Sequence, residues 1–140
     1  MQQKHILLLN FSKIFVSNFP VASFETSVKQ KYYDFIILSE KQNENNAPLS
    51  CSVLLCPQNN IIRKNIKCDT AVTCGMSKKS TVSFSSVRFD EAMICISRRI
   101  EGEGFCLFQG ESKVIYDADL TLYENLILNV IKMIDGCIDI

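Results

Sequence analysis

The sequence predicts an α/β domain with a mixed sheet. In the first half of the chain, apolar strand-like runs alternate with a helix-like segment, and three further strand-like runs with short connections follow in the second half. A long amphipathic segment then ends the chain. Strand–helix alternation favours parallel neighbours, whereas short connections favour antiparallel ones. The length of 140 residues fits one domain over residues 1–140.

The first half begins with a predicted strand over residues 4–10. Its apolar run covers only residues 6–9 and ends at Asn10, which favours a buried strand over a signal peptide. Pro20 suits the first turn of a helix, and apolar residues follow it at helical spacing, so we expect an amphipathic helix over residues 20–31. Residues 33–39 form a continuous apolar run, which is typical of a strand covered on both faces.

The middle of the chain contains two more predicted strands. Residues 40–48 are the most polar stretch and are expected to form a loop. We expect a brief strand over residues 52–56, a helical turn over 60–67, and a third buried strand over 70–74 that Gly75 ends. These segments complete the strand–helix alternation of the first half.

The second half predicts a three-stranded antiparallel meander. Its expected strands cover residues 81–89, 92–100 and 105–108. The connections, at residues 90–91 and 101–104, are two to four residues long, so consecutive strands should be antiparallel neighbours.

Residues 117–138 predict a closing helix, with Asp119 or Thr121 as candidate N-caps. One arc of this helix is apolar and should dock on the sheet. The opposite arc is polar except for Leu128, with Ile131 at its flank. Because these two residues are three positions apart, they are neighbours on the helix surface and form a candidate homodimer interface. The alternative is a monomer with one exposed leucine.

Charge and hydropathy exclude two classes of partner. Fifteen basic and fifteen acidic side chains cancel, so we expect no nucleic-acid partner. No apolar run reaches the roughly 18 residues that a membrane-spanning helix needs, so we expect no membrane insertion.

The cysteines indicate a reducing compartment. Seven is an odd number, most of the cysteines lie within apolar runs, and no Cys-x-x-Cys pair occurs. This pattern indicates neither a disulfide framework nor a zinc site. We expect reduced thiols that act as small apolar side chains, with Cys74 and Cys95 buried and unreactive. The chain is thus typical of a bacterial cytoplasmic protein.

No pattern in the sequence predicts catalysis. His5 is the only histidine, so no Ser/His or Cys/His dyad can form elsewhere. The five glycines fit neither phosphate-binding loop pattern, and the carboxylates are scattered. We therefore expect no catalytic residues, no metal and no cofactor, and the balance favours a protein that is not an enzyme.

A ligand site is one alternative that the sequence leaves open. Lys78 and Lys79 lie with hydroxyl side chains directly after a predicted strand, and Ser39 and Lys41 lie at the end of another. Open α/β sheets bind ligands at the carboxyl ends of their strands, so these residues are candidates for a small-molecule or nucleotide pocket. A solvated loop at residues 75–81 is the competing interpretation, because no predicted helix follows to complete an anion site.

Three segments, in the same order, carry a resemblance to a known family. Residues 34–39 (Asp-Phe-Ile-Ile-Leu-Ser) form the first, residues 71–76 (Ala-Val-Thr-Cys-Gly-Met) the second, and residues 80–87 with their meander the third, before a helix containing Leu122 and Tyr123. From residue 33 onward, the chain resembles the later half of the middle, ATP-binding domain of the Mur ligases. These enzymes are ATP-dependent amino-acid ligases that build the peptidoglycan stem peptide.

The chain departs from the Mur ligase pattern where that family binds nucleotide. No glycine occurs in the 32 residues before Tyr33, so the phosphate loop is missing. Ser39-Glu40-Lys41 replaces the Asn-x-Asp-Asp turn, and residues 120–124 replace the polar His-Asn-x-x-Asn start of the helix. The resemblance therefore implies a cut-down, inactive relative. The expected function is a non-catalytic interaction module linked to cell-envelope biogenesis.

Overall fold

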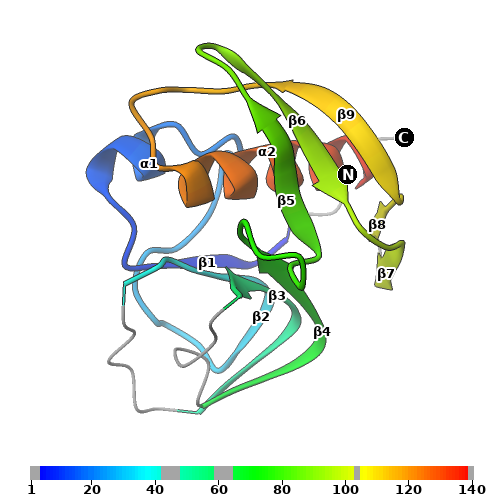
Figure 1. Cartoon of the computed structure of the whole chain (residues 1–140). Helices are drawn as coiled ribbons and strands as arrows, with labels where there is room; N and C mark the ends of the chain where they lie inside the picture. Colours follow the sequence, from blue (N-terminus) through cyan, green and yellow to red (C-terminus); the bar gives the residue numbers. More distant parts are fainter. Residues whose placement is uncertain (1–3, 42–47, 59–64, 103–104, 139–140) are drawn as a thin grey trace.

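The computed structural model describes residues 4–41, 48–58, 65–102 and 105–138 (Figure 1). It has an α/β fold with a seven-stranded mixed sheet, a small two-stranded sheet and a C-terminal helix. In chain order the elements are β1 (Ile6–Leu9), α1 (Lys13–Ser17), β2 (Tyr32–Leu38), β3 (Leu49–Pro57), β4 (Ile66–Cys74), β5 (Val82–Val87), β6 (Glu91–Ile96), β7 (Ile100–Gly102), β8 (Phe105–Leu107), β9 (Gly110–Ile115) and α2 (Leu122–Ile138).

The large sheet has the strand order β1-β2-β3-β4-β5-β6-β9. Neighbours from β1 to β5 are parallel, and β5, β6 and β9 are antiparallel. The predicted mixed sheet is therefore confirmed. β7 and β8 pair with each other in a separate antiparallel sheet.

The predicted meander is wrong in its third strand. β5 falls within the first predicted strand and β6 overlaps the second, but the partner of β6 is β9 and not the segment at residues 105–108. That segment forms β8 and pairs with β7, which begins at the last residue of the predicted second strand. Because residues 97–99 leave the strand conformation after β6, the chain makes a small hairpin before it returns to the sheet. The predicted turn at 101–104 lies partly outside the described residues.

The predicted helix over residues 20–31 is also wrong. The helix in this part of the chain is α1, which Ser12 caps by accepting a hydrogen bond from the Phe15 N–H. The later segment pairs with β1: Glu25 donates its N–H to Ile6 and accepts from the N–H of Leu8. These sheet bonds satisfy the backbone at Glu25, and Val21 and Phe24, two of the apolar residues that suggested a helix, pack against the core without one. Val28, the third, is exposed.

The strands near the N-terminus are buried on both faces, as predicted. In β1, Ile6 and Leu8 pack into one core cluster together with α2, whereas Leu7 and Leu9 pack into a second cluster. β2 and β3 contribute to both clusters in the same way. Two-sided burial explains why these strands appear in the sequence as continuous apolar runs.

β4 differs from the predicted third buried strand. It begins at Ile66, within the predicted helical turn, whose residues 60–64 lie outside the described part. Its first half alternates between exposed and half-buried side chains, because β5 joins β4 only at the pair Cys74–Val82. The connection between them, residues 75–81, is shorter than the dozen residues that parallel neighbours usually need. In Figure 1, β5, β6 and β9 accordingly stand at a steep angle to β1.

The predicted closing helix is confirmed as α2, and Thr121 is its N-cap. The Thr121 hydroxyl accepts from the Glu124 N–H at 3.1 Å, and the Glu124 carboxylate accepts from the Thr121 N–H at 3.0 Å. This reciprocal pair is a capping box. Within the described residues, no helix is long and apolar enough to span a membrane.

The expectation that Leu128 and Ile131 lie on an exposed arc of α2 is wrong. Their exposed fractions are 7% and 3%. α2 packs against β4, β5 and β8. Part of the polar arc is buried as well: Asn125 and Asn129 hold the segment before the helix through hydrogen bonds to its backbone. Neither apolar side chain is available to a second copy.

Candidate functional site

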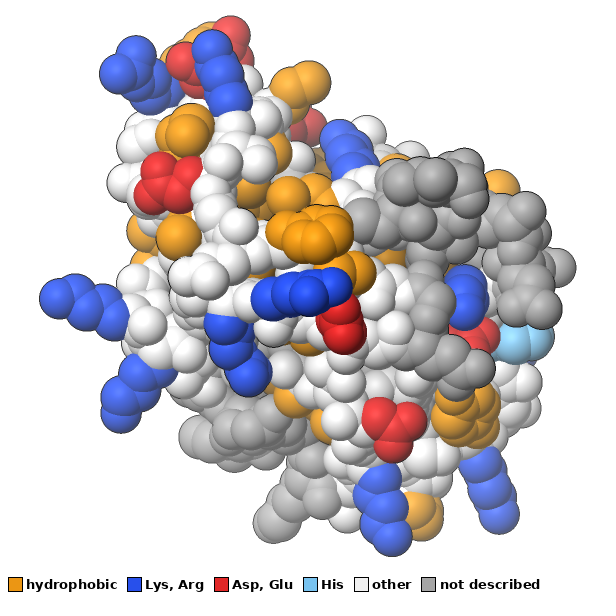
Figure 2. Space-filling view, turned by 90° about the vertical axis from the view of Figure 1, so that its right-hand side faces the viewer, with side chains coloured by type: hydrophobic (Ala, Val, Ile, Leu, Met, Phe, Trp, Pro, Cys, Tyr) orange, Lys and Arg blue, Asp and Glu red, His pale blue; other side chains and the backbone are white. Residues whose placement is uncertain are grey.

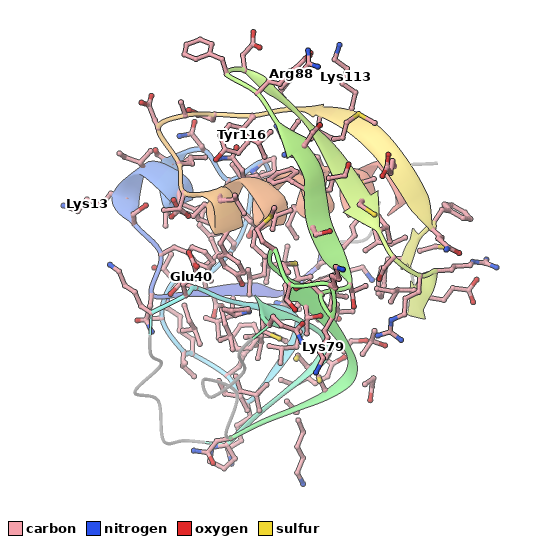
Figure 3. All side chains as sticks on the ribbon, in the orientation of Figure 1. Lys13, Glu40, Lys79, Arg88, Lys113 and Tyr116 are labelled. Carbon is pink, nitrogen blue, oxygen red and sulfur yellow. The ribbon has the colours of Figure 1, made fainter. Side chains whose placement is uncertain are left out.

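The residues predicted to form a ligand site do not converge. Ser39 is buried, and its hydroxyl accepts from the backbone N–H of Lys41 at 3.1 Å, so it faces its own turn. Lys78 and Lys79 are exposed in the turn after β4. β3 lies between β2 and β4, and two strand spacings amount to about 10 Å. Figure 3 shows Glu40 and Lys79 well apart.

α2 packs over the ends of the central strands near Ser39. The Tyr123 hydroxyl donates to the carbonyl of Leu38, and burial raises the pKa of Tyr123 well above its usual value. Partial burial and the neighbouring Glu124 carboxylate raise the pKa of Glu40. The interior of this end of the sheet is therefore packed with helix side chains.

Two buried polar atoms near Gly75, the Gln58 Oε1 and the Ser80 Oγ, have no hydrogen-bond partner among the described residues. A Cβ atom at Gly75 would lie 3.2 Å from the Ser80 Oγ and 3.7 Å from the Gln58 Cβ. Because Gly75 has no Cβ atom, the backbone at this position can lie close to the Ser80 and Gln58 side chains. Sequence reasoning did not single out Gln58 or Ser80 as a pair, because they are 22 positions apart and meet only through the parallel strands.

A cavity of about 520 Å³ lies at the amino ends of β2, β3 and β4, whereas the predicted pocket is at the carboxyl ends of the strands. Its lining residues include Lys31, Ser50, Asn65 and Lys67. Within the described part of the chain, no group of three or more His, Cys, Asp or Glu side chains is placed to hold a metal ion. His5 is exposed on the strand edge, where its backbone N–H donates to the Asp34 carboxylate.

The open edge of β9 is the feature that sequence reasoning missed. Among the described residues, β9 is the last strand of the large sheet and pairs with β6 alone. The Tyr116 N–H donates to the carbonyl of Asp90, on the β6 side. Successive backbone N–H groups point to opposite sides of a strand. The N–H groups of Val114 and Ser112, two and four residues before Tyr116, therefore also face β6. Those of Lys113 and Glu111 therefore face outward, away from the sheet.

The side chains around this edge are exposed. Four of the six residues of β9 are exposed without interruption from Gly110 to Lys113. Phe108, just before the strand, is 64% exposed, and Ile115 at its end is 74% exposed. The Arg99 guanidinium lies 5.5 Å from the Phe108 ring centroid, and Lys113 pairs with Glu91 at 2.8 Å. The edge thus combines unpaired backbone, a charged centre and an apolar residue at each end.

Figure 2 views the molecule from the side on which Figure 1 draws β9. Lys and Arg side chains project from this face, with acidic and apolar side chains between them. In Figure 3, Lys113 points outward from the end of the sheet that also carries Arg88.

The fold and this edge define an α/β domain with a mixed sheet whose last described strand, β9, pairs on one side only. Comparison with protein-family models, curated proteins and solved structures found no match for the chain.

The six described cysteines are free thiols, and we predict slow reaction for three of them. Cys51, Cys56 and Cys74 are buried, and burial raises the pKa of Cys51 to about 12 and that of Cys74 further. Titration of the native protein with a thiol reagent at pH 8 should leave these three unlabelled until denaturant is added, because the thiolate is the reacting form. Rapid native labelling of Cys74, found by peptide mapping, would contradict this.

The expectation of a buried Cys95 is wrong. Cys95 is half-buried, because its side chain faces the outer surface of β6 next to Glu111 of β9. Cys95 should therefore react before Cys74 in the same titration.

Proposed function

We propose that this chain is a non-catalytic interaction module whose open β9 edge receives a strand of a protein partner. The observation that supports this proposal is the outward backbone of Glu111 and Lys113, which pairs with no described strand. α2 reaches the outer side of β9 only at the end of the strand, where Asn129 donates to the carbonyl of Ile115. An added strand forms main-chain hydrogen bonds for affinity, and the side chains along the edge provide specificity.

The apolar ends of the edge strengthen this proposal. Phe108 and Ile115 flank β9 and are both large and exposed. Burying such side chains stabilises a complex by an amount that grows with the apolar area removed from water. Among the described residues, β4 also lacks a strand partner on one side before Cys74, but Lys67 and Asp69 are its exposed side chains there. Its one exposed large apolar neighbour in the described chain, Met76, lies beyond the Cys74 end, where β5 joins β4.

The non-catalytic part of the proposal rests on residue types. His5 is the only histidine of the chain, and it is exposed directly before β1. No glycine pattern for a phosphate loop occurs in the sequence.

Kinship with the Mur ligases and a link to cell-envelope biogenesis stay part of the proposal. They rest on the resemblance of residues 34–39, 71–76 and 80–87 to that family. In this view the chain has kept the strands, lost the nucleotide site and acts as an interaction module in cell-envelope biogenesis.

Site-specific photo-cross-linking in the native cells tests the proposed edge. A photoreactive amino acid at position 113 should give a discrete cross-linked protein, whereas the same amino acid at position 67, on the free side of β4, should not. Lys113→Pro should abolish the binding, because it removes an outward N–H donor and leaves the β6 side intact. Lys113→Ala keeps that N–H and is the matched control. Equal cross-linking from positions 113 and 67 would contradict the proposal.

Small-molecule or nucleotide binding is the second candidate function, and the cavity at the amino ends of β2–β4 favours it. Its volume, about 520 Å³, falls within the usual range for ligand pockets. Lys31 and Lys67 give it a cationic lining suited to an anionic ligand. A thermal-shift screen with nucleotides and peptidoglycan precursors separates the two functions. A shift that Lys67→Ala removes would favour this pocket over the β9 edge.

A further inference from the structure

We infer that the strand received by β9 is β9 of a second copy of this chain, in an antiparallel pair with its two-fold axis at Ser112. This inference rests on the proposed function and names its partner. It would join two seven-stranded sheets, β9 to β9, into one continuous sheet.

The backbone restricts the possible registers. In antiparallel pairing, residues whose amides face outward must lie opposite residues whose amides also face outward. Along β9 these are Glu111, Lys113 and Ile115, as the Tyr116–Asp90 hydrogen bond establishes. The carbonyl of Ile115 already accepts from Asn129 of α2, which leaves Glu111 and Lys113 for a second strand. A two-fold axis must therefore pass through a residue and not between two residues.

Charge selects one register among those that remain. An axis at Lys113 would place two lysines directly opposite, and an axis at Glu111 would place two glutamates opposite. Like charges in directly opposite positions destabilise a strand pair. An axis at Ser112 places Glu111 of each copy opposite Lys113 of the other, so that both charged pairs are attractive.

The two side chains lie on the correct face for this contact. Glu111 and Lys113 are cross-strand partners of Cys95 and Met93, so both lie on the outer face of the sheet. Lys113 already pairs with Glu91 on that face, and a second carboxylate from the other copy would complete the contacts of its ammonium group. The same register brings the Phe108 end of one strand to the Ile115 end of the other.

Charged residues on an edge strand ordinarily keep it from pairing with other strands. Here the two charges have opposite sign and are spaced two residues apart, so they repel most strands and complement their own antiparallel copy. The arrangement favours one specific homotypic pair over indiscriminate edge-to-edge aggregation.

Sedimentation equilibrium on the full chain tests the inference with two charge variants. Glu111→Lys should weaken the dimer about tenfold or more, because the substituted side chain would then place a second positive charge opposite Lys113 of the other copy. Lys113→Glu should weaken it similarly. An equimolar mixture of the two variants should dimerise, because each lysine-bearing edge then meets a glutamate-bearing one. If a variant were monomeric only because it had misfolded, mixing the two variants would not restore the dimer. Circular dichroism checks the fold of each variant.

Two results would overturn the inference. One is a native protein that stays monomeric at millimolar concentration. The other is dimerisation that neither variant weakens, since the contact would then lie elsewhere. A monomeric native protein with a cross-link from position 113 to a different protein would overturn self-pairing and leave the proposed function standing.

Discussion

Phe15→Ala is expected to lower the free energy of unfolding by about 3–5 kcal/mol, the range for removing a fully buried aromatic ring. Phe15 is 0% exposed and is the buried residue of α1. Its ring stacks on Phe11 at 4.1 Å between centroids and lies 5.9 Å from Phe19. The substitution therefore opens a cavity beneath the connection that leads from β1 to β2.

Ile14→Ala is the matched control for Phe15→Ala. Ile14 is the preceding residue of the same short helix and is 53% exposed. Its truncation should change the free energy of unfolding by less than about 1 kcal/mol. Urea denaturation of both variants measures the difference. Equal effects would show that the aromatic cluster does not anchor this connection.

Asn125→Ala is expected to lower the free energy of unfolding by about 2–4 kcal/mol, since it leaves several buried backbone groups without partners. Asn125 is 2% exposed and accepts from the Asp117 N–H at 2.8 Å. Its side-chain amide also donates to the carbonyls of Asp117 at 2.9 Å and Thr121 at 3.0 Å. These bonds fix the turn between β9 and α2.

Asn18→Ala provides the comparison for Asn125→Ala. The Asn18 amide makes one exposed hydrogen bond, to the carbonyl of Ile14. Its loss should cost no more than about 1 kcal/mol, because water replaces the partner. If the two asparagine variants unfold at the same urea concentration, the buried network does not hold the turn.

The fully buried elements could be predicted from the sequence. β1, β2 and β3 are continuous apolar runs because both of their faces meet a core cluster. α2 could be placed because its apolar periodicity and its Thr121–Glu124 capping box are local signals.

The remaining elements depend on contacts between residues that are distant in the sequence, and no local sequence pattern indicates such contacts. Residues 20–31 have helical apolar spacing, yet Glu25 bonds to the edge of β1. Asn125 and Asn129 look like solvent-facing residues, yet they are buried because their amides bond the chain that precedes the helix. Leu128 and Ile131 are buried with them, which removed the predicted interface.

β9 escaped prediction for the same reason that it is a candidate interaction site. A strand exposed along both faces shows no apolar alternation, and Glu111, Ser112 and Lys113 resemble a loop. The available signal was Val114 and Ile115 before Tyr116, a short β-branched run that follows Gly110. Only the pairing with β6 shows that these residues continue the sheet.

Amide hydrogen exchange along β9, followed by NMR at low and at millimolar protein concentration, tests the open edge most directly. In dilute protein, the Ser112 and Val114 amides should be protected by β6, while those of Glu111 and Lys113 exchange as freely as exposed amides. At high concentration the Glu111 and Lys113 amides should become protected as the second copy pairs. Protection of these two amides in the dilute protein, or free exchange at both concentrations, would contradict an open edge that receives a strand.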